Sequence, residues 1–376
     1  MSKYFLIVLS VLLTACSDGN DSRFQAQPEI PPDFTEADAW MENFVATEEA
    51  FPGGSYVVVD REGGVLHKAA FGNLEEDSLV LLASTSKVPS VTLLMALHDD
   101  DDNVNFEIDE PIASYLPWQG VWDPAITTEH LVSNRSGIPG LANLFLRPDD
   151  YAPHLCQFLP LGTLQACAET LYTTPLPGLV STPANTAFDY GGSQWHLSGA
   201  VAEITGGGTL NQLWDQYIGA PCGLEVTQIG NNLSLAPLWD GNAESLVGQD
   251  NANSEGGMMS SLDDYAKLLS LHLNDGLCGD NRVMSADSLA FMRIERTTAE
   301  ADSWGYGMGW WLVEPDGGGP TTLFLDPGFY GSVAWLDTER EYAAVVFFEE
   351  YSGESGSVGS GAVVEQFIPI VDTALD

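Results

Sequence analysis

The chain has 376 residues, with 12 lysines and arginines against 54 aspartates and glutamates, so its formal net charge at pH 7 is −42. A surface of that sign repels nucleic-acid phosphates and anionic lipid head groups, and we expect neither as a partner. Hydrophobic residues make up 44% of the sequence, which excludes a disordered acidic chain. The composition favours a large folded unit of two lobes whose acidity keeps it soluble in a salty environment.

The N-terminus has the features of an export signal. Lys3 supplies a positive charge, and the apolar run over residues 4–13 is too short to span a bilayer. The segment 1–15 therefore predicts a signal peptide, and its junction with Cys16 resembles a bacterial lipobox, whose cleavage leaves that thiol to carry a diacylglyceryl group. A plain signal peptide ending in Ala-Cys is the alternative. By the same resemblance, Ser17 favours lipid anchoring at the outer membrane, facing the periplasm.

Four cysteines remain beyond Cys16, and an even number in an oxidising compartment predicts two disulfide bonds. Three pairings are possible, and we choose Cys156–Cys167 together with Cys222–Cys278. No cysteine has the spacing of a metal ligand, and the six histidines form no H-E-x-x-H pattern. The sequence predicts neither a metal site nor a cofactor.

The predicted elements begin after a polar, proline-bearing tether over residues 16–34. A helix starts at Thr35, which we interpret as its N-terminal cap. Strands are predicted over residues 55–60, 65–71, 321–325, 332–336 and 342–348, a surface loop over 353–361, and a closing helix over 362–374. Residues 35–99 and 250–376 would form a sheet lobe, and residues 100–249 a mostly helical lobe.

This order of elements predicts an α/β fold of the α+β kind, in which N- and C-terminal helices flank an antiparallel sheet. The acidic run in the inserted stretch invites a calcium interpretation, because Asp99, Asp101, Asn103 and Glu110 match ligand positions of an EF-hand loop. Val104 occupies the position that requires glycine, so we prefer a charged turn on the surface.

The segment Ser84-Thr85-Ser86-Lys87 carries the strongest chemical signal. A serine and a lysine three residues apart at the start of a helix face the same side, so the amine can take the hydroxyl proton. S-x-x-K is the nucleophile signature of penicillin-binding proteins and class A β-lactamases. The chain has only four lysines, which strengthens the match. A helix-start serine beside a solvated lysine is the alternative.

Further motifs resemble the serine β-lactamase and penicillin-binding-protein superfamily, closest to its class C-like serine hydrolases, which include β-lactamase-fold esterases. Besides Ser84 and Lys87, the resemblance is carried by residues 108–117, 127–139, 188–192, 199–206, 256–264 and 305–310. It implies that Tyr190 is the tyrosine of the second motif and relays protons between Ser84, the leaving group and water. We expect burial to lower the pKa of Lys87, so that it acts as a co-base.

The resemblance also places the third motif at residues 326–331. It implies an oxyanion hole made by the backbone N–H groups of Ser84 and Phe329. Gly192, Asp326 and Gly328 stand where the family binds substrate, but Gly192 replaces an asparagine and Asp326 replaces a lysine or histidine.

The replacement at Asp326 bears on the choice of substrate. An ionised carboxylate about 4 Å from a substrate carboxylate costs on the order of 4 kcal/mol at an effective dielectric constant of 20. If Asp326 points into the site, neutral esters are preferred. If it turns away to cap a loop, Arg293 or Arg296 could still bind a substrate carboxylate.

The sequence therefore predicts a serine hydrolase that forms an acyl-enzyme at Ser84 and acts as a carboxylesterase on small neutral esters. A D-amino-acid peptidase, a D-Ala-D-Ala carboxypeptidase or a weak class C-like β-lactamase is the alternative within enzymes. A non-catalytic module that binds an acyl group as a sensor is the alternative outside them.

Overall fold

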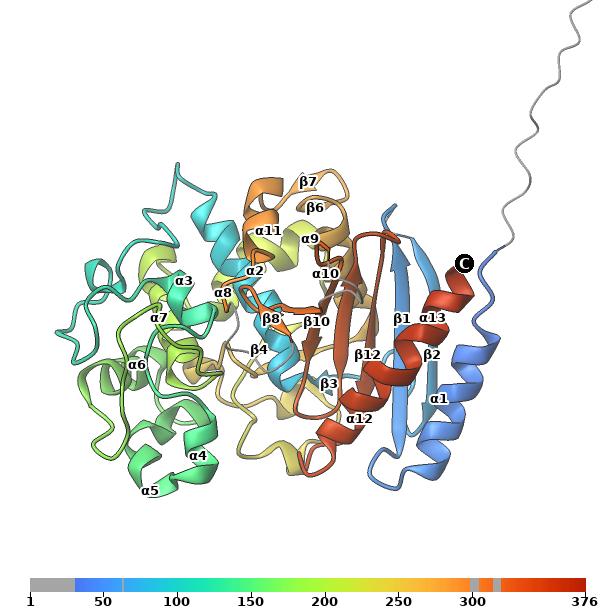
Figure 1. Cartoon of the computed structure of the whole chain (residues 1–376), viewed down its shortest axis with the longest axis horizontal. Helices are drawn as coiled ribbons and strands as arrows, with labels where there is room; N and C mark the ends of the chain where they lie inside the picture. The colour runs from blue at the N-terminus through green and yellow to red at the C-terminus, as the bar shows by residue number, and fades with distance from the viewer. Residues whose placement is uncertain (1–30, 63, 298–303, 314–318) are drawn as a thin grey trace, which may run out of the picture. The chain divides into compact units, whose positions relative to one another are not determined.

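The computed structural model describes residues 31–62, 64–297, 304–313 and 319–376 (Figure 1). The predicted signal peptide, the lipid-modified Cys16 and most of the tether lie outside the described residues. Within Asp33–Asp376, which pack as one unit, strands come mainly from the two ends of the sequence and helices from the stretch between them.

A seven-stranded antiparallel sheet is the centre of the fold, with the strand order β2-β1-β12-β11-β10-β9-β8. The neighbouring strands β1 and β12 are rich in valine and aromatic residues, which suit a sheet covered on both faces. Both are buried along nearly their whole length, and they pair from Gly54 with Phe348 to Asp60 with Tyr342. The strands are β1 (Gly53–Asp60), β2 (Val65–Gly72), β8 (Gly305–Tyr306), β9 (Trp311–Val313), β10 (Leu323–Pro327), β11 (Val333–Asp337) and β12 (Tyr342–Phe348).

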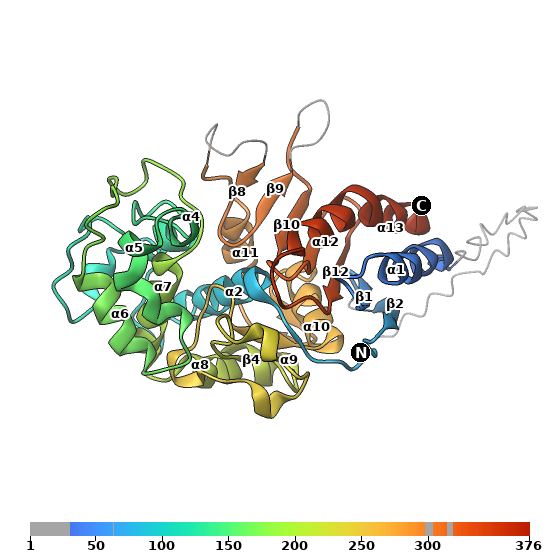
Figure 2. The same ribbon diagram turned by 90° about the horizontal axis from the view of Figure 1, so that it is seen from below.

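Terminal helices cover one face of this sheet, which confirms the predicted fold class (Figure 2). Helix α1 (Thr35–Thr47) lies beside the C-terminal helix, which consists of α12 (Gly356–Ala362), a π-helical turn and α13 (Ile368–Leu375). By length and composition, the helical stretch Gly356–Leu375 could cross a membrane. In this fold its Phe367 and Val371 are instead fully buried in the core against the sheet.

Helices α2 (Lys87–His98) and α10 (Leu262–Leu273) belong to the core on the opposite face. Two small sheets lie apart from the large one. The first contains β3 (Val80–Leu81), β5 (Met258–Ser260) and β4 (Gln228–Ile229), and the second contains β6 (Leu277–Cys278) and β7 (Asn281–Arg282). The first of them joins the segment before Ser84 to the segment after Glu255, which brings two distant parts of the chain to one site.

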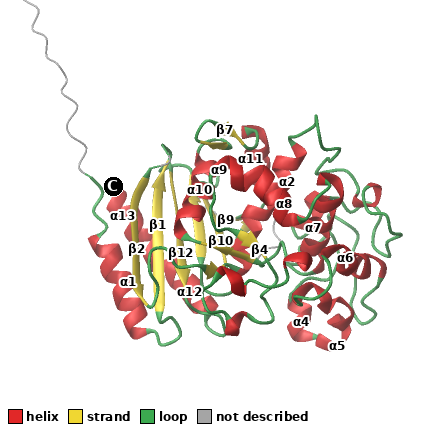
Figure 3. Ribbon diagram, turned by 180° about the vertical axis from the view of Figure 1, so that it is seen from behind, coloured by secondary structure: helices red, strands yellow, loops and turns green. Residues whose placement is uncertain are grey.

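Helices dominate the inserted stretch and gather to one side of the strands (Figure 3). They are α3 (Thr128–Val132), α4 (Ala142–Leu146), α5 (Pro148–Tyr151), α6 (Leu164–Thr173), α7 (Ser193–Gly206), α8 (Leu210–Trp214) and α9 (Ala220–Cys222), and α11 (Ala286–Met292) follows α10. Both predicted disulfide bonds, Cys156–Cys167 and Cys222–Cys278, are present.

Three local predictions need correction. Residues 356–361, predicted as loop, are helical because Gly359 is small enough for α12 to pack closely against Phe51. Thr35 does not cap α1; its N–H and hydroxyl donate to Asp33. Residues 305–306 and 311–313 add two short edge strands that were not predicted.

The acidic turn is not a calcium loop in this structure. Asp99 accepts hydrogen bonds from the backbone N–H of Ser285 and the hydroxyl of Ser288, where α11 begins. Among the described residues, no group of three or more histidine, cysteine, aspartate or glutamate side chains could hold a metal ion.

Candidate active site

Ser84 lies in a 3₁₀ turn, Ala83–Ser86, that leads directly into α2. Ala83 has φ = +46°, a left-handed conformation that is uncommon for a residue other than glycine and typical of strained functional turns. The turn leaves Ser84 partly exposed, while Lys87 one helical turn later is fully buried. A partly exposed hydroxyl above a buried amine is the arrangement that the S-x-x-K pattern predicts.

The two residues between Ser84 and Lys87 anchor the turn. The Thr85 hydroxyl donates to the carbonyl oxygen of Asp326 on β10 over 3.1 Å. The Ser86 hydroxyl accepts from the backbone N–H of Met258 on β5 over 3.1 Å. One anchor is in the large sheet and the other is in a small sheet. The position of Ser84 therefore depends on both sheets.

Ser84, Lys87 and Tyr190 come together, as the sequence predicts. Lys87 Nζ donates to Ser84 Oγ over 2.9 Å and lies 4.6 Å from the centroid of the Tyr190 ring. Tyr190 also acts electrostatically on Lys87, and Lys87 in turn opposes the rise of the Tyr190 pKa. Tyr190 belongs to the loop before α7 and reaches the site from the helical side of the fold. The three side chains therefore gather around the Lys87 nitrogen.

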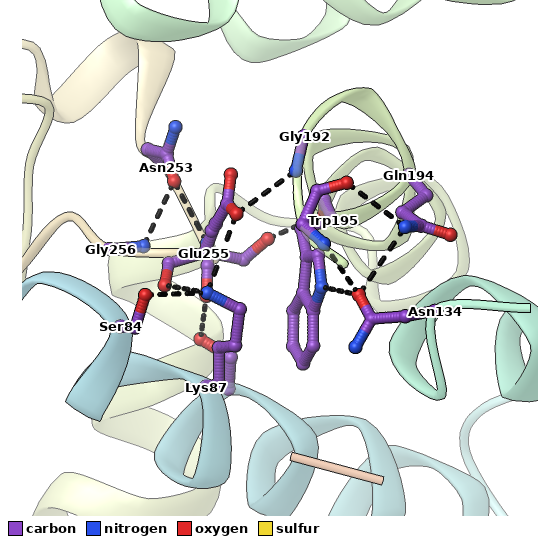
Figure 4. Close-up of polar contacts among 12 residues, drawn as sticks. Ser84, Lys87, Asn134, Gly192, Gln194, Trp195, Asn253, Glu255 and Gly256 are labelled. Carbon is purple, nitrogen blue, oxygen red and sulfur yellow. Dashed lines mark hydrogen bonds and ion pairs between the residues drawn. The ribbon is translucent and has the colours of Figure 1, made fainter. Parts of the chain in front are cut away.

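Glu255 is a fourth member of the site that the sequence reasoning missed. Its Oε1 lies 3.4 Å from Lys87 Nζ, and its backbone carbonyl accepts from the same nitrogen over 3.2 Å (Figure 4). Glu255 side-chain exposure is 5% and that of Lys87 is 0%, so the ion pair is shielded from water. Glu255 directly precedes the motif at residues 256–264, which begins with Gly256-Gly257. A charged residue beside that glycine pair is the sequence feature that could have indicated its role.

Asn134 was also missed, and it holds the loop that carries Tyr190. Its Oδ1 accepts from the backbone N–H of Gly191 over 2.8 Å and from the Trp195 indole over 2.8 Å. Gln194 donates to the carbonyl oxygen of Asp189 over 2.6 Å and closes the loop from the other side. These contacts fix the backbone on both sides of Tyr190, and Figure 4 shows Asn134 beside Trp195 and Gln194.

The protonation states differ from the sequence-based expectation. Burial alone would lower the pKa of Lys87, but the Tyr190 phenol and the Glu255 carboxylate outweigh it, and the pKa lies above its ordinary value. The prediction of a lowered Lys87 pKa is therefore wrong. Burial likewise raises the pKa of Tyr190, although Lys87 opposes the shift. At neutral pH the resting site keeps both protons.

The segment predicted to complete an oxyanion hole lies beside Ser84. Gly328 has no side chain because a Cβ there would lie 2.5 Å from the carbonyl oxygen of Leu82, so the end of β10 approaches the nucleophile turn closely. Among the hydrogen bonds of the described residues, none uses the backbone N–H of Ser84 or Phe329 as donor. Both donors are thus available to a developing oxyanion. The Phe329 ring is 51% exposed and offers an apolar rim.

The three predicted substrate-binding residues are all buried. Asp326 is 1% exposed, and its Oδ2 accepts from the backbone N–H of Val88 on α2 over 3.2 Å. Gly192 is buried at the start of α7, and Gly328 donates its N–H to Ser332. Each of them holds one element of the site against another, and their contact with substrate stays a prediction.

Asp326 also cannot repel substrate in the way that the sequence argument supposed. Burial raises the pKa of its carboxyl group well above the ordinary value, which disfavours the charged form. The carboxyl group also faces α2, which is the turned-away arrangement that weakens charge-based selection of substrate. The repulsion argument for neutral substrates therefore has to be replaced.

Arg293 and Arg296 are both engaged within the protein. Arg293 donates to the carbonyl oxygen of His272, and Arg296 pairs with Glu129 over 2.7 Å. Every lysine and arginine among the described residues has such a partner. Arg293 Nε and Arg296 Nη2 are nevertheless buried without a hydrogen-bond partner, so the alternative that these arginines bind a substrate carboxylate stays a prediction.

Aromatic residues form the wall beside Tyr190. The Tyr190 and Trp311 rings are stacked with centroids 5.4 Å apart, and Phe188 and Tyr306 pack around them. Tyr190, Trp311 and Phe188 are each partly exposed. A wall of this kind suits apolar substrate groups.

The fold and the site define a serine hydrolase of the β-lactamase and transpeptidase fold. A family model described as Beta-lactamase matches residues 37–364. The chain belongs to this family, whose members act on small-molecule esters and amides.

Similar proteins cover nearly all of the chain. Penicillin-binding protein 4 of Amycolatopsis lactamdurans is 28% identical over 378 residues, covering 88% of this chain and 92% of that protein. The structure of EstCE1, a hydrolase with promiscuous acyltransferase activity, matches 90% of this chain and 97% of its own with a TM-score of 0.70 and 18% identity. A D-stereospecific amidohydrolase from Streptomyces sp. matches 89% of this chain and 99% of its own, with a TM-score of 0.61 and 18% identity. At such identities the two structures show a shared fold.

Proposed function

We propose that this protein is a carboxylesterase that hydrolyses small neutral esters through an acyl-enzyme at Ser84. The observation that carries the proposal is the hydrogen bond from Lys87 to Ser84, with the Tyr190 ring 4.6 Å from the same Lys87 nitrogen. In the form of the site whose Lys87–Tyr190 pair has given up one proton to solvent, Ser84 transfers its proton to that pair while its oxygen attacks the ester carbonyl. The oxyanion accepts hydrogen bonds from the backbone N–H groups of Ser84 and Phe329.

The rest of the cycle follows from the same groups. When the tetrahedral intermediate collapses, the ester C–O bond breaks and the Lys87–Tyr190 pair returns the proton to the leaving alcohol. Water then attacks the acyl group and gives its proton to the same pair, the bond between the acyl carbon and Ser84 Oγ breaks, and the acid leaves. The proton next returns to Ser84, which restores the starting state.

The preference for neutral esters is supported by the state of the cations. Lys87 is the cation beside the nucleophile, and Glu255 neutralises it at 3.4 Å. A carboxylate brought to the site would meet the negative charge of Glu255, and Lys87 is already paired and does not offset the carboxylate's desolvation. The partly exposed aromatic wall of Tyr190, Trp311 and Phe188 favours an apolar group in its place.

Esters that differ only in charge test this preference. We expect p-nitrophenyl methyl succinate to be hydrolysed with a kcat/KM at least about tenfold above that of p-nitrophenyl hemisuccinate, a difference of about 1.4 kcal/mol. The two compounds have matched acyl chains, so the carboxylate is the variable. Equal rates, or hydrolysis of the anionic compound nitrocefin at the rate of p-nitrophenyl butyrate, would contradict the proposal.

The second candidate is a peptidase or carboxypeptidase of D-amino-acid substrates. The 28% identity with penicillin-binding protein 4 favours it. The same Ser84 chemistry would cleave an amide, with the amine as leaving group. Release of D-alanine from a D-Ala-D-Ala peptide faster than hydrolysis of neutral esters would establish this alternative.

We also propose that the chain is exported and anchored at the outer membrane through a lipid on Cys16. The motif that ends at Cys16 and the two disulfide bonds support export to an oxidising compartment. Expressed in a bacterium fed an alkyne-labelled fatty acid, the wild type should carry label and sediment with membranes. Cys16→Ala should lose both properties, and a mature N-terminus found elsewhere would refute the anchor.

A further inference from the structure

The buried ion pair of Lys87 and Glu255 is part of a set of contacts that also includes Ser84 and the Glu255 backbone. Lys87 Nζ meets the Glu255 carboxylate at 3.4 Å, the Glu255 carbonyl oxygen at 3.2 Å and Ser84 Oγ at 2.9 Å. Both side chains are shielded from solvent. Since an unpaired buried charge is costly, each member of the pair stabilises the charged form of the other.

The backbone around Glu255 is shaped to hold its carboxylate in place. Asn253 Oδ1 accepts from the backbone N–H groups of both Glu255 and Gly256, over 2.8 and 3.0 Å. Glu255 Oε1 also accepts from the backbone N–H of Gly192 over 2.9 Å. A Cβ on Gly191 would lie 2.2 Å from that oxygen, so the missing side chain makes room for the carboxylate.

Other titratable groups also face this pair. Tyr190 and Asp326 act on Lys87 together with Glu255, and Asp326 comes from the sheet side. Burial raises the pKa values of Tyr151, Tyr190 and Tyr306, and the negative charge of Glu255 raises them further. Burial raises the pKa of Asp326 and disfavours its charged form, whereas the Glu255 side chain lies 3.4 Å from Lys87 Nζ.

We propose that Glu255 is a positioning residue that keeps Lys87 protonated throughout the cycle, so that Tyr190 alone accepts the proton of Ser84. This inference rests on the proposed function and assigns separate roles within the Lys87–Tyr190 pair. The Ser84 proton moves to the oxygen of a Tyr190 phenolate that the Lys87 cation stabilises, and from there to the leaving alkoxide. Lys87 and Glu255 neither gain nor lose a proton in any step.

Direct titration of Lys87 tests the proposal without using turnover. The chain has four lysines, and Lys3 falls within the predicted signal peptide. With lysines labelled with ¹³C at Cε, the Lys68→Arg and Lys267→Arg variants identify the Lys87 signal by difference. We expect Lys87 to titrate above the ordinary lysine value of about 10.4 in the wild type. Titration below that value would overturn the proposal, even if Glu255 variants do not fold.

The Glu255→Gln variant tests the same proposal through kinetics. The amide oxygen can still accept the Gly192 N–H, but the negative charge is lost. Activity requires the Lys87–Tyr190 pair to lose one proton, so kcat/KM of the wild type should rise with pH about tenfold per unit below its apparent pKa. Removing the Glu255 charge favours that loss and should move the rising limb about 1–3 pH units lower, with KM little changed.

Glu203→Gln is the matched control, because Glu203 is a partly buried glutamate on α7 that contacts Gln165 and the Leu210 N–H instead. The Glu203→Gln variant should leave the rising limb of the kcat/KM–pH profile at its wild-type position. A limb that stays unmoved in Glu255→Gln would overturn the proposal, as would a lower kcat with no shift, which is what a merely structural role produces. Failure of the proposed function has a different signature, since turnover would then survive Ser84→Ala.

Discussion

Replacing Ser84 with alanine is expected to lower kcat/KM for p-nitrophenyl butyrate by at least about 10⁴-fold, because no other group can form the covalent intermediate. Steady-state hydrolysis measured by nitrophenolate release gives the result. Stability should change little, since Ser84 is partly exposed and its hydroxyl contacts only groups of the site. The loss would then report chemistry rather than unfolding.

Ser90→Ala is the control on the same helix. Ser90 is buried one turn beyond Lys87, and its hydroxyl donates to the Ser254 carbonyl oxygen over 2.7 Å. It should retain esterase activity with a modest loss of stability of about 1 kcal/mol. Undiminished turnover by Ser84→Ala would contradict the acyl-enzyme, and a stoichiometric burst without turnover in the wild type would favour the acyl-binding sensor.

Lys87→Met is expected to lose both activity and stability. The substitution removes the cation that contacts Ser84 and Tyr190, and we expect kcat/KM to fall by about 10³-fold or more. It also leaves Glu255 as a buried carboxylate without its partner, which typically costs about 3–5 kcal/mol. Urea unfolding followed by tryptophan fluorescence measures the second effect.

The double variant Lys87→Met with Glu255→Gln separates these two effects. Removing both charges should recover much of the lost stability, because no unpaired ion remains in the interior. Activity should stay as low as in Lys87→Met. If the double variant is no more stable than Lys87→Met, the unpaired Glu255 charge is not the cause of the lost stability.

Much of the fold was accessible from local pattern. The valine-rich run of β1 and the strand-forming run of β12 have the composition of buried strands, and both were predicted within two residues of their observed bounds. Helix α12 was missed because its glycines and serines have low helix propensity. Its close packing against Phe51 outweighs that preference, and such packing is invisible in the local sequence.

Some residues of the candidate site could likewise be found from local sequence, and others only from the tertiary structure. Ser84 and Lys87 could be found because their contact is local, across one turn of a helix. Tyr190 was found only through resemblance to a family. Glu255 lies 168 residues from Lys87 along the chain, and nothing in either segment indicates their pairing.

The amino-acid sequence alone therefore predicted a candidate nucleophile, its lysine and much of the order of strands and helices, because each depends on neighbouring residues or on a short motif. The cysteine pairing was a choice among three possibilities, which the structure bears out. Tertiary structure decided the charge state of the site. Only folding places Glu255 against Lys87 and buries Asp326 behind α2. Protonation depends on burial and on charges within a few ångströms, and those neighbours come from distant parts of the chain.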